Sequence, residues 1–262
     1  MVKPEQNLID ASGTAEALWR GWPSLSALPE IRTDQWRSAV VIAAHPDDEV
    51  LGTAGTLSVL AAAGCRLRIV AVTDGEASHS DSLLLDGMPP VPPRTGTRIW
   101  GSPPERALAV RRARERAAAL RVLAANGADV VRLGLPDSGL AVHEADLVPL
   151  LRNLAGGFDA CFAPWDNDAH PDHEAVGRAA RKAGLTPFSY PIWMWHWALP
   201  GDIRVPWDRA QRLRLPPAVA AAKAAAIRCF GSQLEWRGPD TGPVLPEGVA
   251  AHFLRDQEVF FG

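Results

Sequence analysis

Cysteine is scarce in this 262-residue chain, and long hydrophobic runs are absent. The three cysteines, Cys65, Cys161 and Cys229, are odd in number and scattered in apolar surroundings, which predicts buried, reduced thiols rather than disulfides or a cysteine-based zinc site. Charged residues such as Arg66 and Arg68 interrupt the longer apolar stretches, and the first residues lack the apolar core of a signal peptide. We therefore expect a cytoplasmic protein with no integral membrane segment.

A strong charge of either sign is also missing. Lys and Arg together number 27, Asp and Glu number 30, and the formal net charge is -3. This balance gives no overall electrostatic sign of a protein that binds nucleic acid or an anionic membrane, and it leaves local basic patches open. It favours a small-molecule partner and no nucleic acid, and it leaves both a monomer and a homo-oligomer open.

Strand-like and helix-like segments alternate along the chain. Strand patterns occur at residues 38–45, 66–76, 129–135 and 158–165, and helix patterns at 50–64, 105–127, 143–157, 172–184 and 218–230. This alternation predicts an α/β fold with a mostly parallel sheet and helices on both faces, which binds ligands beyond the carboxyl ends of its strands. No G-x-G-x-x-G fingerprint follows the first strand, which disfavours a nucleotide-binding protein. We expect one domain over residues 1–262, with a core at about 38–235 and a C-terminal tail at 236–262.

Two segments depart from this alternation. Residues 187–200 (PFSYPIWMWHWALP) begin a Trp-rich C-terminal extension, and the spacing of Trp193, Trp195 and Trp197 predicts a strand. The three rings either pack in the core or stack on a sugar. The segment 78–104 is dense in Pro, Gly and Ser, which predicts a long loop that closes over a site.

Histidine and acidic residues gather where two of the predicted strands end. The motif HPDDE (residues 45–49) follows the first strand, and DAHPDH (168–173) follows the fourth. Imidazole and carboxylate ligands together suit a divalent ion, zinc first, and three protein ligands with open positions are typical of a catalytic site. In the competing interpretation, Asp47, Asp48 and Glu49 only stabilise a helix N-terminus. That would explain the acids of the first motif but not the second motif.

At these motifs the sequence resembles the LmbE-like, or PIG-L, zinc-dependent N-acetylglucosaminyl deacetylases. The resemblance covers about residues 40–233 and is carried by AAHPDDEVLG, VTDGE, RARE, LPDSGL, DAHPDH and KAAAIRCFGSQ, in the order of the family. It implies a Rossmann-like sheet and a metal-dependent amidohydrolase with Zn²⁺ as its cofactor. The implied substrate is a small conjugate of N-acetylglucosamine, from which the acetyl group is removed.

The resemblance also implies the roles of four residues around the metal. His45, Asp48 and His173 are expected to bind zinc, and Asp47 to act as the general base. This division of labour is chemically reasonable, because a carboxylate beside the metal that is not itself a ligand can take a proton from water and pass it to the departing amine.

Four further residues match positions around the substrate. His170 is expected to stabilise the oxyanion and Asp172 to orient it, with the carboxylate favouring the imidazolium form. Arg112 and Asp137 are expected to line the sugar pocket. The alternatives are that His170 is a metal ligand, Arg112 lies on a solvated helix face, and Asp137 is a turn residue.

One position departs from the family pattern. Phe230 stands two residues before Ser232, where the family usually has a histidine. Loss of this polar contact predicts an unusual substrate. The metal site and the base are expected to be intact. The alternative function is a non-catalytic, zinc-bearing carbohydrate-binding module, against which Asp47 argues because a pure binding module needs no base.

Overall fold

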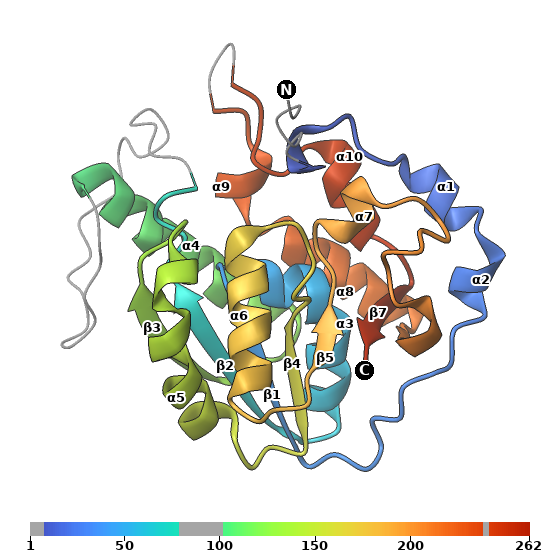
Figure 1. Ribbon diagram of the computed structural model, residues 1–262, viewed down its shortest axis with the longest axis horizontal. Coiled ribbons are helices and arrows are strands. Elements are labelled where there is room, and N and C mark those ends of the chain that lie inside the picture. Colours follow the sequence, from blue (N-terminus) through green and yellow to red (C-terminus); the bar gives the residue numbers. More distant parts are fainter. Residues whose placement is uncertain (1–7, 79–101, 238–240) are drawn as a thin grey trace, which may run out of the picture.

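The computed structural model describes residues 8–78, 102–237 and 241–262, and its centre is a seven-stranded sheet (Figure 1). The strands are β1 (Ser38–Ala43), β2 (Arg66–Thr73), β3 (Asp129–Leu135), β4 (Ala160–Pro164), β5 (Phe188–Tyr190), β6 (Ala210–Arg214) and β7 (Gln257–Phe261). Their spatial order is β3-β2-β1-β4-β5-β7-β6. The first five strands pair in parallel with one another, and β7 is antiparallel to both β5 and β6. The predicted α/β class with a mostly parallel sheet is confirmed.

Helices cover both faces of the sheet, as predicted (Figure 1). The long ones are α3 (Asp48–Ala62), α4 (Pro103–Val122), α5 (Glu144–Ala155), α6 (Pro171–Lys182) and α8 (Pro217–Ile227). Alternate strand residues point to opposite faces, so Val41 and Ile69 pack with α3, α4 and α8. Val40, Ile42 and Val70 pack on the other face with α5 and α6. Two apolar layers therefore hold the central strands rigidly in place.

The remaining helices are short. They are α1 (Glu16–Arg20), α2 (Pro23–Ser26), α7 (Met194–Trp197), α9 (Gly231–Leu234) and α10 (Glu247–Ala250), with 3₁₀ turns at Leu8–Asp10, Leu140–His143, Trp207–Arg209 and Ala251–Phe253. Among the helices of the described segments, none has the length and apolar character that crossing a bilayer requires.

The Trp-rich run is not the predicted strand. Only Phe188–Tyr190 (β5) is extended, and the chain then turns into α7. It turns because the buried carboxylate of Asp168 accepts the backbone N–H groups of residues 192–194. A partner so distant in sequence leaves no signal in the alternation of the tryptophans.

The C-terminal residues also differ from the prediction, which placed no strand at β6 or β7. The segment expected to be a tail contains β7, which lies between β5 and β6 in the sheet. Val259, Phe260 and Phe261 are buried there. The end of the chain is therefore part of the core.

The predicted closing loop lies mostly outside the described residues, which resume at Ser102. The helix α4 begins there with a capping box, in which Ser102 and Glu105 each satisfy a backbone N–H of the first turn. This cap sets where α4 starts and hence where its arginines lie.

Candidate active site

The sequence motifs converge on a pocket at the carboxyl ends of the parallel strands. The pocket has a volume of about 230 Å³. It is lined by His45, Asp47, Asp48, Leu51, Ala77, Ser78, Arg112, Asp137, Ser138, His170, His173, Ile192, Trp193, Gln233, Val244 and Leu245. Of the eight predicted site residues, seven line it, and Asp172 lies buried just behind. Parallel strands bring these loops to one edge, as the fold class requires.

The turns around the pocket carry unusual backbone conformations. Asp47 has a φ of 144°, Ser138 of 62° and Ala169 of 71°. Among the described non-glycine residues, only Ala124 is also in positive φ. Such conformations are costly for residues with a Cβ and persist where the surrounding structure enforces them, often at functional sites.

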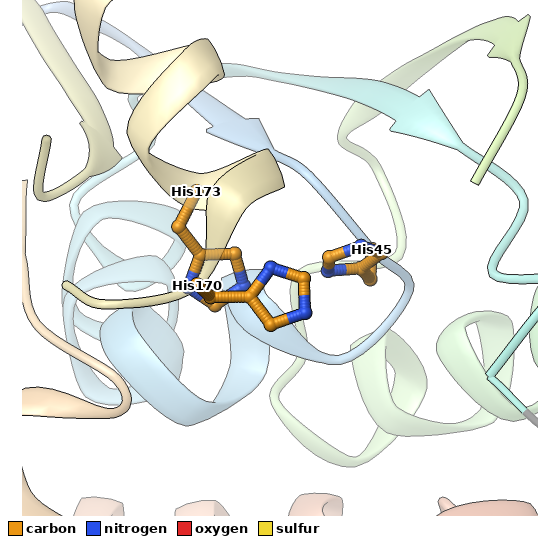
Figure 2. Close-up of side chains that lie close together, drawn as sticks. All are labelled: His45, His170 and His173. Carbon is orange, nitrogen blue, oxygen red and sulfur yellow. The ribbon is translucent and has the colours of Figure 1, made fainter. Parts of the chain in front are cut away.

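Two histidines and one aspartate of the predicted metal set face one another. Asp48 Oδ2 lies 3.5 Å from His45 Nδ1, and Asp48 Oδ1 lies 3.3 Å from His173 Nε2. His45 comes from the loop after β1, and His173 comes from the first turn of α6 (Figure 2). The carboxylate thus lies between the two imidazoles, each of which presents one ring nitrogen to it.

The electrostatics of this cluster favour a cation. Burial lowers the pKa of His45, but Asp137, Asp172 and Asp48 outweigh it and hold that pKa well above its usual value. Burial likewise lowers the pKa of His173, and the carboxylates around it raise it to about 9. The carboxylates that favour protonated imidazoles would equally stabilise a divalent ion. Such an ion would replace the protons and bind the neutral ring nitrogens. The donor set therefore fits zinc.

Among the described residues, two combinations of side chains bring all their donor atoms close enough to share one metal ion, and neither is the predicted set of His45, Asp48 and His173. The donor atoms of His45, His170 and His173 lie within 4.8 Å of one another, and so do those of His45, Asp137 and Asp172. The three histidines surround one space (Figure 2), with the His170 ring 4.5 Å from that of His173 and 4.9 Å from that of His45 between centroids. The geometry supports a metal site without choosing among these sets.

His170 caps the N-terminus of α6 with its ring. Its Nδ1 accepts the backbone N–H of Asp172 at 3.3 Å, so a neutral His170 carries its hydrogen on Nε2. Burial, together with the charges of His173 and His45, lowers its pKa to about 3. These effects favour the neutral form of His170, whose Nε2–H is a hydrogen-bond donor.

Asp172 contacts different partners from those expected. Its carboxylate accepts the backbone N–H groups of Ser138 and Leu140 and lies 3.2 Å from Nε2 of His45. Its link to His170 is through the backbone N–H alone. The carboxylate therefore faces His45, because the two N–H groups of the loop after β3 turn it that way.

Asp47 is buried and paired with Arg112. Arg112 Nη2 donates to Asp47 Oδ1 at 3.0 Å and to the carbonyl of Pro46 at 2.8 Å, and Nη1 donates to the carbonyl of Gly75 at 3.1 Å. Burial raises the pKa of Asp47 to about 7, against the opposing effect of Arg112. A carboxylate with this pKa can accept and release a proton near neutrality. Arg112 is itself buried and not on a solvated helix face.

Asp137 is held on both sides. Its Oδ1 lies 3.1 Å from His45 Nε2, and its Oδ2 accepts the N–H of Ala77. Burial raises the pKa of Asp137, but His45 and Arg112 lower it by more than burial raises it. The pKa therefore lies below its usual value, and the carboxyl group is ionised. Glu76 accepts the backbone N–H of Asp137 at 2.9 Å and thereby joins the loops after β2 and β3.

Three buried residues beside the site have no catalytic or metal-binding role in the sequence prediction, although Glu49 and Asp168 lie inside its two motifs. Glu49 and Arg116 form a buried ion pair at 2.8 Å, and Glu49 also accepts the N–H of Asp47. Asp168 is fully buried and bonds to His173. The only rule that could have found them is the general one that a buried charge needs a partner. The rule could not be applied, because burial cannot be read from the motifs.

The C-terminal third of the chain supplies the apolar wall of the pocket. Trp193, Val244 and Leu245 line it, with Gln233 from α9. Trp195 and Trp197 pack instead against other tryptophans, namely Trp19 and Trp165. Of the tryptophan stripe, only Trp193 therefore reaches the pocket.

Phe230 lies in the apolar core. Its side chain is buried among hydrophobic residues and does not line the pocket. Ser232 donates to Glu115 of α4, which fixes the short helix that carries Gln233 into the pocket.

Comparison with known proteins identifies the family. The family model described as GlcNAc-PI de-N-acetylase (PIG-L) matches residues 40–184, more than half of the chain and both histidine motifs. The chain therefore belongs to the PIG-L family of deacetylases.

Individual relatives agree with this assignment. The 1D-myo-inositol 2-acetamido-2-deoxy-alpha-D-glucopyranoside deacetylase of Rhodococcus opacus is 27% identical over 232 residues, which cover 81% of this chain and 73% of that protein. The A40926 pseudoaglycone deacetylase structure has a TM-score of 0.55 at 18% identity and covers 87% of this chain and 97% of that one. The N,N'-diacetylchitobiose deacetylase structure from Pyrococcus horikoshii has a TM-score of 0.51 at 23% identity, with 79% and 72% covered. The two structures share the fold.

Proposed function

We propose that this protein is a zinc-dependent hydrolase that removes the N-acetyl group from a small conjugate of N-acetylglucosamine. The observation that carries the proposal is the placement of Asp47. It lies in the same pocket as His45, Asp48 and His173, is paired to Arg112, and has a pKa of about 7. A site built only to bind a sugar has no use for such a base, which disfavours the alternative of a non-catalytic module.

His45, Asp48 and His173 are the proposed metal ligands, through Nδ1, a carboxylate oxygen and Nε2. When bound, zinc would acidify water and polarise the amide carbonyl. The remaining nitrogen of each imidazole is held by a carboxylate, since His45 Nε2 lies 3.1 Å from Asp137 and 3.2 Å from Asp172, and His173 Nδ1 lies 2.7 Å from Asp168. Carboxylates that hold the second nitrogen of a ligating histidine fix its orientation.

Asp47 and His170 handle the proton and the developing charge. Asp47 takes a proton from the attacking water and then delivers it to the nitrogen of the departing amine. Arg112 fixes the base through Oδ1, which leaves Oδ2 for the water. His170 directs its Nε2–H toward the oxygen of the tetrahedral intermediate, since its Nδ1 is occupied by the backbone of Asp172.

The sugar class comes from the relatives. The Rhodococcus opacus relative is a deacetylase of a 2-acetamido-2-deoxy-glucopyranoside joined to inositol, and the family is described by GlcNAc-PI. Arg112 and Asp137 are the proposed contacts to sugar hydroxyl groups, and both line the pocket. The cytoplasmic location predicted from the sequence stays a prediction.

The test is incubation of the zinc-loaded protein with a panel of N-acetylglucosaminyl conjugates, read by mass for loss of one acetyl group. We expect one or more members to lose acetyl, with the product amine appearing in equal amount. The matched control is Asp47→Asn, which keeps the shape of the base and should release almost none. Binding of a conjugate without acetyl release from any member would favour the binding module.

A further inference from the structure

The fully buried carboxylate of Asp168 has four hydrogen-bond partners, which is more than it needs to hold its own loop in place. Asp168 follows β4, and its side chain is completely excluded from solvent. Oδ1 accepts the N–H groups of Ile192 and Met194, both at 2.9 Å. Oδ2 accepts the N–H of Trp193 at 2.9 Å and contacts His173 Nδ1 at 2.7 Å.

These four contacts determine which nitrogen of His173 carries hydrogen. An ionised carboxylate is an acceptor with about four lone-pair positions, and three backbone N–H groups cannot do anything but donate to it. The fourth contact is therefore a donation from His173 Nδ1–H. In the neutral imidazole that a metal ion requires, Nε2 then carries the lone pair, which is directed at the space beside Asp48, whose Oδ1 is 3.3 Å away.

We propose that Asp168 is a positioning residue that holds His173 in the tautomer and ring orientation required of a metal ligand. This inference rests on the metal site of the proposed function. The same carboxylate holds the turn that places Ile192 and Trp193 on the pocket wall. Asp168 therefore fixes the metal ligand and the substrate wall relative to each other.

The turn alone does not account for the contact to His173. The turn needs only the three backbone donors, and yet the shortest of the four distances from the carboxylate is the one to the imidazole. Histidine ligands of metals commonly give their second N–H to a carboxylate, and loss of that partner typically weakens metal affinity roughly 10–100-fold.

The experiment compares Asp168→Asn with Glu258→Gln. Glu258 is also a buried carboxylate that accepts two backbone N–H groups, those of Gly55 and Thr56, and it contacts neither the pocket nor a histidine. Both variants should lose stability. Only Asp168→Asn should weaken zinc affinity, by about 10–100-fold in chelator competition, because an amide that turns its NH₂ toward Nδ1 forces hydrogen onto Nε2.

A second measurement needs no variant. In wild-type protein loaded with cadmium-113 and labelled with ¹⁵N-histidine, the metal should couple to Nε2 of His173 while Nδ1 keeps its proton. Coupling through Nδ1, or a folded Asp168→Asn variant that binds zinc as tightly as wild type, overturns the role of Asp168. A wild-type protein that binds no metal overturns the metal site itself, and the ligand role of His173 with it.

Discussion

At the scale of single residues, Asp47 and Asp48 are neighbours with opposite environments. Burial raises the pKa of Asp47 to about 7, whereas His173 and His45 overcome burial at Asp48 and hold its pKa well below the usual value. One carboxyl group can exchange a proton near neutrality and the other stays ionised. Paired carboxyl groups whose pKa values are pushed apart in this way commonly divide catalytic roles between them.

The first prediction separates these roles. Asp47→Asn should keep its zinc and lose about a hundredfold to ten-thousandfold in kcat, because an amide can accept the Arg112 hydrogen bond but not a proton. Asp48→Asn should lose zinc affinity, and excess zinc should partly restore its activity. Metal content measured beside kcat decides, and the assignment fails if Asp47→Asn loses its zinc while Asp48→Asn retains it.

The second prediction concerns the two histidines at the N-terminus of α6, His170 and His173. His173→Ala should abolish stoichiometric zinc binding, since Nε2 is a proposed ligand. His170→Ala should keep zinc and lower kcat roughly 10²–10³-fold, the usual effect of losing one oxyanion donor. Elemental analysis of both variants tests this, and equal loss of zinc from the two would place His170 among the ligands.

At the scale of elements, the loop after β2 packs at Gly75 directly against the guanidinium group of Arg112 on α4, which leaves no room for a Cβ there. A Cβ built on Gly75 would lie 2.2 Å from Arg112 Nη1, and Gly75 has a φ of +69°. Because Nη1 of Arg112 donates to the carbonyl of Gly75, the loop and the helix jointly set the position of the guanidinium that holds Asp47.

The third prediction uses this contact. Gly75→Ala should lower kcat at least several-fold by displacing Arg112 from Asp47. Gly64→Ala is the matched control, because Gly64 has a φ of +74° and open space around its Cβ position. Both variants should lose about 1–2 kcal/mol of stability to backbone strain, and kcat of Gly64→Ala should match wild type. If kcat falls equally in both, the loss reflects strain rather than the contact to Arg112.

The elements differ in how far the sequence specifies them. β1, β2, β3 and β4 and the long helices have apolar patterns of their own, so alternation alone predicts the α/β class, and HPDDE and DAHPDH mark the loops that meet. The turn at 192–194, the strand β7 and the pair of Glu49 with Arg116 depend on partners far away in the chain. For the same reason, the sequence predicts which residues lie at the pocket better than it predicts their contacts. The carboxylate of Asp172, for example, was expected to orient His170 but contacts His45.

At the scale of the whole molecule, an ion-pair cluster joins the two ends of the chain. Glu16 of α1 lies 2.9 Å from Arg255 Nε and 2.8 Å from His252 Nδ1. Burial raises the pKa of Glu16, but hydrogen bonds from His252 and Arg255 outweigh this and lower it below its usual value. The N-terminal helices are thereby attached to the segment that leads into β7.

The fourth prediction follows from that pKa. A carboxyl group whose pKa is lowered by folding stabilises the protein above its unfolded-state pKa, and the contribution is lost as the pH falls through the folded-state pKa. Glu16→Gln should therefore be less stable than wild type at pH 7, and the difference should shrink below about pH 4. Urea unfolding at both pH values measures it, and a difference independent of pH would assign the effect to packing.

The parallel pairing of β1 with β4 also determines the stage of folding at which the site can form. His45 and His173 follow these two strands, and α3, β2, α4, β3 and α5 intervene between the strands along the chain. Contacts this distant in sequence form slowly, because bringing them together costs the entropy of closing a long segment of chain. Zinc should therefore bind after the strands of the sheet have paired. It should stabilise the folded state by mass action and not direct folding. In a refolding experiment followed with a zinc-sensitive dye, metal uptake should lag behind the burial of the core tryptophans.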